Sequence, residues 1–311
     1  MPDFLGFRPE RRGWSHQKTL AISAGIAAPD TRGAHPRRSA VDAGRCPRYG
    51  YGYGVFSIAA LVPSPPLLVP ELCGRPGAPG GDPDDPVAVL RAAALDAATA
   101  LAASAARWTV LGVGAHDQNF PSTTRGTFRG FGADVVVGLG PAPREPAPAD
   151  AQLPLPVLIA GWLREQVAPG VEVTARLLAA DTAPAECARI GTALRAELDA
   201  DPAPHAVLVV GDGAATLTVQ APGYLDERAA PEQQRVDAAL RAGARAGLAA
   251  LDPALCADLL IEGRAAYQAL AGLFAADPAD PRVRTLYQAA PFGVGYDVSV
   301  WQPGGREGIE L

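Results

Sequence analysis

The chain has 311 residues, of which 48% are hydrophobic and 19% charged, and its 27 basic and 33 acidic residues give a net charge of −6. This length is enough for one large domain or two small ones with a substantial core, and the acidic balance speaks against a nucleic-acid-binding protein. No apolar run approaches the roughly 20 residues that span a bilayer, so we expect a soluble cytoplasmic protein without membrane contact. The cysteines lack CxxC spacing and indicate neither a zinc site nor a disulfide framework; they are Cys46, Cys73, Cys187 and Cys256.

Residues 1–54 differ in charge from the rest of the chain. They hold nine basic and four acidic residues, a net of +5, which leaves −11 for residues 55–311. They show no sustained periodicity and cannot bury enough apolar area to offset the entropy lost on ordering. We interpret them as a disordered basic extension; an upstream start codon, with true initiation near Val55, is one explanation for it. A transit peptide and a basic arm for nucleic acid or an acidic partner are alternatives, but the basic residues are dispersed rather than clustered.

The segment Val55–Val62 is almost continuously apolar, which predicts a strand buried on both faces of a parallel sheet. Pro63, Pro65 and Pro66 end this strand, because proline donates no hydrogen bond to a sheet. Open α/β sheets bind ligands at the carboxyl ends of their strands. We therefore expect the loop that contains Ser64 to form one wall of a site.

Helices and strands alternate beyond a surface loop at residues 73–86. Asp85 is expected to cap a helix that has Pro86 at its first position. Helices are predicted at 87–106, 156–167, 184–200, 232–249, 253–262 and 264–275. Further strands are predicted at 107–114, 134–138, 171–178, 206–210, 284–290 and 293–301. This alternation predicts an α/β three-layer sandwich with a mostly parallel central sheet and a C-terminal antiparallel hairpin.

Candidate chemical groups follow the predicted strands. His116 comes after a buried strand and is either a metal ligand or general base, or a loop histidine of no consequence. Asp212 stands between two glycines and is either a site carboxylate or part of an Asx-turn or helix cap. His205 begins a strand, lies at the opposite edge of the sheet and is interpreted as structural. Dinucleotide, P-loop, serine hydrolase and zinc protease motifs are absent, so these residues alone leave the function open.

Several stretches resemble one protein family in their order along the chain. Ile58–Glu71 is similar to an opening strand followed by His-Pro-Pro-Leu-Leu-Val-Pro-Glu. Val110–Asp117 resembles a strand that ends in Pro-His, and Phe131-Gly132 resembles a Phe-Gly pair that follows it. Val207–Ala215 resembles a strand that ends in Ser-Asp-x-Ser-His. Gly293–Tyr296 with Trp301 resembles the closing strand. The family is the LigB type, which comprises the catalytic B subunit of class III extradiol ring-cleavage dioxygenases and Memo-like relatives. The resemblance implies a LigB-like domain over residues 55–311.

The resemblance also implies an Fe(II) ion held by two histidines and a carboxylate, with open positions for a catecholate and dioxygen. The second ligand histidine corresponds to His116, the C-terminal carboxylate is placed at Glu262, and the acid that precedes the acid/base histidine corresponds to Asp212. This chain departs from the pattern at two positions. Ser64 replaces the first ligand histidine and Ala215 replaces the acid/base histidine, so the iron ligand set is incomplete.

Three hypotheses follow. The first is Fe(II)-dependent ring opening of a catechol-type substrate, with His116 as a metal ligand. The second is a metal-free ligand-binding or scaffold protein that keeps the cleft for a small aromatic molecule. The third is hydrolysis in the same pocket by Ser64 and Asp212. The sequence leaves a homo-oligomeric state open.

Overall fold

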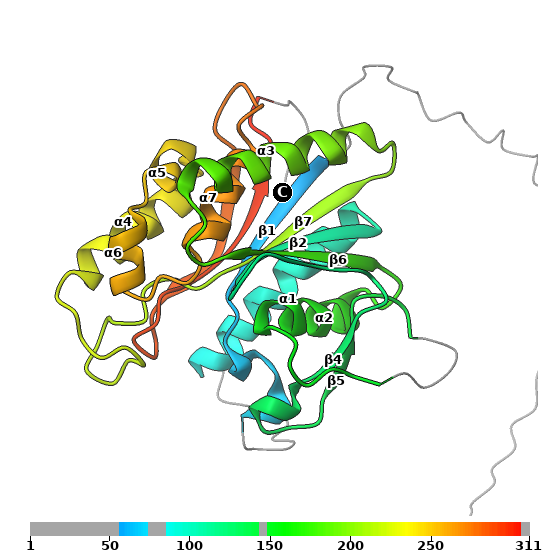
Figure 1. Ribbon diagram of the computed structural model, residues 1–311, viewed down its shortest axis with the longest axis horizontal. Coiled ribbons are helices and arrows are strands. Elements are labelled where there is room, and N and C mark those ends of the chain that lie inside the picture. The colour runs from blue at the N-terminus through cyan, green and yellow to red at the C-terminus, as the bar shows by residue number, and fades with distance from the viewer. Residues whose placement is uncertain (1–55, 74–84, 143–147, 306–311) are drawn as a thin grey trace, which may run out of the picture. The chain divides into compact units, whose positions relative to one another are not determined.

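The computed structural model describes residues 56–73, 85–142 and 148–305 (Figure 1). The basic extension predicted for residues 1–54 lies outside the described residues, as does most of the loop predicted at 73–86. All the elements below belong to one compact unit, Tyr51–Leu311.

A seven-stranded sheet forms the centre of this unit, in the order β3-β6-β2-β7-β1-β9-β8. Its strands are β1 Phe56–Val62, β2 Arg107–Gly114, β3 Gln118–Phe120, β6 Glu172–Ala179, β7 His205–Val210, β8 Arg282–Ala289 and β9 Tyr296–Gln302. The α/β class and the C-terminal hairpin of β8 and β9 are confirmed. The expected mostly parallel sheet is instead mixed, because β3, β9 and β8 pair antiparallel beside the parallel strands β6, β2, β7 and β1. A second, two-stranded sheet pairs β4 Arg125–Thr127 with β5 Val136–Gly138.

Helices cover both faces of the large sheet (Figure 1). One face carries α1 Pro86–Ser104 and α2 Leu155–Val167, and the other carries α3 Pro184–Ala200, α4 Ala229–Ala242, α5 Arg245–Ala249, α6 Pro253–Asp258 and α7 Arg264–Leu273. Successive side chains of β1 point to opposite faces of the sheet. Ile58 and Ala60 belong to the core on the side of α1 and α2, and Ala59 and Leu61 belong to the core on the side of α3 and α7. A strand buried on both faces needs the continuous apolar run that predicted it.

Helix α1 begins as predicted, since the Asp85 side chain accepts the N–H of Val87 at 3.0 Å and Pro86 occupies the first turn. Its length and apolar composition are sufficient for a membrane span, which corrects the expectation that no apolar run approaches that size. Its Leu90, Leu101 and four alanine side chains are nevertheless buried in the core beside the sheet. We therefore describe α1 as a core helix of the α/β unit.

One predicted helix, at 232–249, is divided into α4 and α5. Gly243 ends α4 with a φ of +64°, a left-handed conformation that glycine adopts without steric cost. A Cβ atom there would lie 2.6 Å from the carbonyl oxygen of Pro281, so the close approach of the chain also requires glycine. The next helix, α5, then begins at Arg245.

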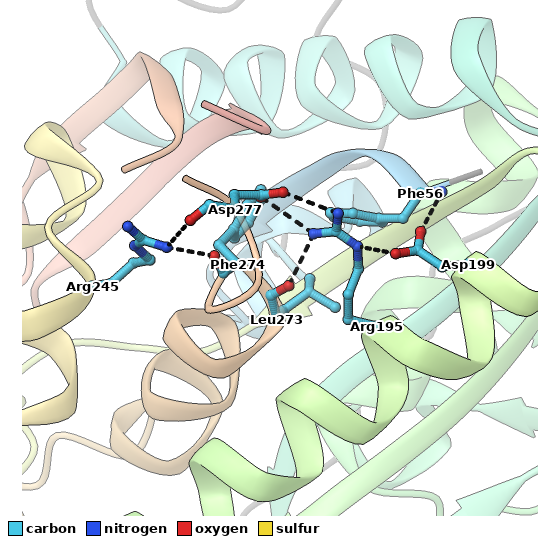
Figure 2. Close-up of polar contacts among 7 residues, drawn as sticks. All are labelled: Phe56, Arg195, Asp199, Arg245, Leu273, Phe274 and Asp277. Atoms are coloured by element: carbon cyan, nitrogen blue, oxygen red, sulfur yellow. Dashed lines mark hydrogen bonds and ion pairs between the residues drawn. The ribbon is translucent and has the colours of Figure 1, made fainter. Parts of the chain in front are cut away.

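A buried arginine connects α3 to the start of β1 (Figure 2). Arg195 is 5% exposed and donates to both carboxylate oxygens of Asp277, at 3.0 and 3.2 Å, and to Asp199 at 2.7 Å. Its guanidinium carbon lies 5.1 Å from the centre of the Phe56 ring, and the Phe56 N–H donates to Asp199. Arg245 of α5 supports the same segment by donating to the carbonyl oxygen of Asp277 at 2.9 Å. The buried charge is thus matched by two carboxylates and an aromatic face.

Candidate functional site

A pocket of about 360 Å³ lies at the carboxyl ends of the parallel strands. Residues at or just beyond the ends of β1, β2, β6 and β7 line it, because parallel strands end at the same edge of a sheet. Its wall is largely apolar and includes Val113, Leu155, Pro156 and Val210. Its polar side chains are those of Ser64, Asp212 and Glu262.

Ser64 and Asp212 form a hydrogen-bonded pair in this pocket. β1 and β7 are paired in register with Val62 opposite Val210, so the residues two positions further along each chain also meet. Asp212 accepts the backbone N–H of Ser64 at 3.0 Å and its hydroxyl at 2.5 Å. Ser64 is buried, and its backbone N–H and its hydroxyl both donate to this one carboxylate.

The carboxyl group of Asp212 is poorly solvated. Burial raises its pKa from 3.8 to about 6, the hydrogen bonds from Ser64 oppose this rise, and the nearby charge of Glu262 adds to it. None of the described residues that line the pocket is basic. Asp212 is consequently held by neutral donors, without a cation from the protein among the lining residues.

The backbone around Asp212 is fixed by the start of α7. The Gly263 N–H donates to the carbonyl oxygen of Asp212 at 2.8 Å, and the Tyr267 hydroxyl donates to that of Gly211 at 3.0 Å. A Cβ atom at Gly263 would lie 2.5 Å from the Tyr267 ring and 2.8 Å from the Asp212 carbonyl oxygen, so this approach requires glycine. The close approach of Gly263 to Asp212 also brings the neighbouring Glu262, whose side chain is exposed, to the pocket.

The structure does not bring His116 to the pocket lining. His116 is exposed in the loop after β2, and its neighbour Asp117 accepts the N–H of Ala179 at 2.7 Å. Ala215, at the position of the acid/base histidine in the resembling family, carries no group that transfers protons. His205 begins β7 and its Nε2 lies 3.0 Å from a carboxylate oxygen of Asp201, which agrees with the structural interpretation.

These residues do not fit an Fe(II) ion held by two histidines and a carboxylate. Within the described ranges, no group of three or more His, Cys, Asp or Glu side chains is arranged to hold a metal ion. Among the lining residues, the only side chain at a family histidine position is that of Ser64. Its hydroxyl is a poor Fe(II) ligand and already donates a hydrogen bond to Asp212.

Some pocket residues were not predicted. Ala180 follows β6, and its position was available from the sequence because β6 was expected to be parallel and to end at the same edge. Leu155 and Pro156 come from the first turn of α2, and only the packing of α2 against the sheet places them there. Tyr267 supports the site from the second turn of α7, and no local pattern distinguishes it from a core residue.

Comparison with known proteins gives a structural likeness but no match to a protein family. No protein-family model matches the chain, and no curated protein matches it. The chain is similar to a crystal structure of an uncharacterized protein from Escherichia coli K12, with a TM-score of 0.44 and 13% sequence identity over 79% of this chain and 99% of that one. A likeness of this size carries no argument about function, and the LigB-type relationship remains a prediction.

Proposed function

We propose that this chain is a small-molecule-binding protein whose pocket holds a small aromatic ligand through Asp212 and Ser64, without an iron ion. The observation that carries the proposal is the Ser64–Asp212 pair at the end of β1 and β7. In the resembling family a histidine that binds iron stands at the position of Ser64. Here the same position serves to orient a carboxylate.

The pocket has properties suited to such a ligand. Its volume of about 360 Å³ falls in the range of small-molecule sites, roughly 300–1,000 Å³. The apolar wall provides area for a ring, and a carboxylate oxygen of Asp212 accepts further hydrogen bonds from a ligand O–H or N–H. The proposal includes a divergent relationship to the LigB-type family and a cytoplasmic location, both of which rest on the sequence.

The Ala180→Trp variant tests this proposal. Ala180 is exposed and lines the pocket, so a large side chain there is expected to fill the pocket without disturbing the core. Catechol and phenol should bind the wild-type chain in ligand-observed NMR, and their signals should be unaffected by Ala180→Trp protein. Equal binding to both proteins, or binding to neither, would contradict the proposal.

A second candidate function is the Fe(II)-dependent opening of a catechol ring. The observation that favours it is that His116 and Asp212 follow parallel strands that end at the same edge of the sheet, and that Glu262, just before α7, lines the pocket there. The exposed position of His116 speaks against it. The iron content of the purified protein separates the two functions.

A further inference from the structure

The charged side chains that line the pocket are all acidic. Asp212 lies in the pocket wall and Glu262 beside it, and no basic side chain belongs to the described lining. The buried guanidinium of Arg264, which is 3% exposed, contacts the backbone of the lining residue Ala180. It donates to the carbonyl oxygens of Ala180 and Thr182 and to the side chain of Gln268, so these N–H groups are already bonded within the protein.

We infer that the pocket selects ligands that carry a protonated amine on a small apolar body, with the ammonium group between Asp212 and Glu262. This inference rests on the proposed function and specifies its ligand class. An ammonium group would supply the cation that the lining lacks, and its hydrogen bonds to a carboxylate would be charge-assisted. A ligand carboxylate would meet two like charges and no basic donor, so the same lining rejects aromatic acids.

Three compounds with the same ring and different charges test the inference by isothermal titration calorimetry on the full chain: benzylamine, benzyl alcohol and benzoate. Benzylamine is expected to bind at least about tenfold more tightly than benzyl alcohol, and benzoate should give no measurable binding. The Asp212→Asn variant should lose the preference for the amine. Glu262→Gln should reduce the preference for benzylamine over benzyl alcohol. Because it changes an exposed side chain, it tests the inference even if Asp212→Asn fails to fold.

The control variant is Glu227→Gln, which removes the same charge from an exposed residue outside the pocket lining and should leave all three affinities unchanged. If benzyl alcohol and benzylamine bind equally and Ala180→Trp abolishes both, the charge inference fails while the ligand-binding function stands. If no compound binds, both fail. MgCl₂ is titrated into the protein alone and into the protein with benzylamine. Displacement of benzylamine by magnesium would assign the carboxylates to a metal ion and overturn the inference.

Discussion

Replacing Arg195 should lower the stability of the fold. It neutralises Asp277, which is itself buried, and it packs over Phe56. Arg195→Met keeps much of the apolar stem and leaves Asp277 buried without a cation, so we expect the free energy of unfolding to fall by about 3–5 kcal/mol. Urea unfolding followed by circular dichroism measures this change.

The matched control lies in the same helix. Arg189 pairs with Glu186 at the surface of α3, where both side chains are exposed to solvent. Arg189→Met should therefore leave the urea midpoint almost unchanged. Similar losses in the two variants would show that Arg195 acts through helix propensity and not through its buried pair.

Ser64 should control the protonation of Asp212. In Ser64→Ala the backbone N–H still reaches the carboxylate but the hydroxyl donor is lost, so the pKa of Asp212 should rise above its value of about 6. Titration of the aspartate carboxyl carbons by NMR detects this rise. Ser64→Thr retains a hydroxyl and should keep the wild-type pKa; a shift of the same size in both variants would contradict the assigned role of the hydroxyl.

At the scale of elements, α3 and α7 are held together by glycines that face a neighbouring backbone. A Cβ atom at Gly191 would lie 1.9 Å from the carbonyl oxygen of Ala269, and one at Gly272 would lie 2.3 Å from that of Ala188. Gly191→Ala should force the helices apart and lower the free energy of unfolding by about 1–3 kcal/mol, although alanine is the better helix former. Thermal unfolding measures the loss.

Gly170→Ala provides the comparison for this substitution. Gly170 lies in the turn before β6, and nothing stands within 4 Å of the position that its Cβ would take. The melting temperature of Gly170→Ala should stay at the wild-type value or rise slightly, because alanine reduces the entropy of the unfolded chain. A loss as large as that of Gly191→Ala would exclude the steric explanation.

An element was predictable from sequence where a strand is buried on both faces or where a helix begins with a capping residue and a proline. β1 followed from its apolar run, and the start of α1 from Asp85 and Pro86. The short strands β3 and β4 were missed, since three residues are too few to show a periodicity. The break at Gly243 was missed because a glycine inside a helical pattern is ambiguous until its contact with Pro281 is known.

The site was predictable to the extent that strand ends define it. Ser64 and Asp212 follow two strands that were expected to be parallel, and the register of β1 and β7 brings them together. The position of Glu262 depended on the resemblance, and the contact of Gly263 with Asp212 now accounts for it. The exposure of His116 was not predictable, because the direction of a loop side chain depends on packing that local sequence does not encode.

At the scale of the whole molecule, two acids, the half-buried Asp212 and the buried Asp297, should shape the dependence of stability on pH. Burial raises the pKa values of Asp212 and Asp297 from 3.8 to about 6. The folded chain thus binds protons that the unfolded chain has released, so this contribution to stability is complete below pH 3.8 and is lost as the pH rises through about 6. Urea midpoints compared across this interval should show it. Asp212→Asn should flatten the dependence, whereas Glu227→Gln should retain it.

Iron content decides between the two candidate functions. Protein purified anaerobically with Fe(II) should retain far less than one iron per chain, because the pocket does not contain a set of three ligand side chains among the described residues. Elemental analysis of the wild type and of His116→Ala should therefore give equal, low values. About one iron per wild-type chain that disappears in His116→Ala would establish the dioxygenase-like alternative and justify a screen of catechols.

The central position of β1 has a consequence for biosynthesis. β1 is the first strand of the described chain to leave the ribosome, but its neighbours in the sheet are β7 and β9, which are translated much later. The apolar strand must therefore wait for β7 on one side, and its other side stays unpaired until the C-terminal hairpin has been made. Such long-range pairing is slow. A chain shortened before Tyr296 would leave one edge of β1 open permanently. Premature termination should therefore yield aggregated nascent chains that require a chaperone, and not a smaller folded domain.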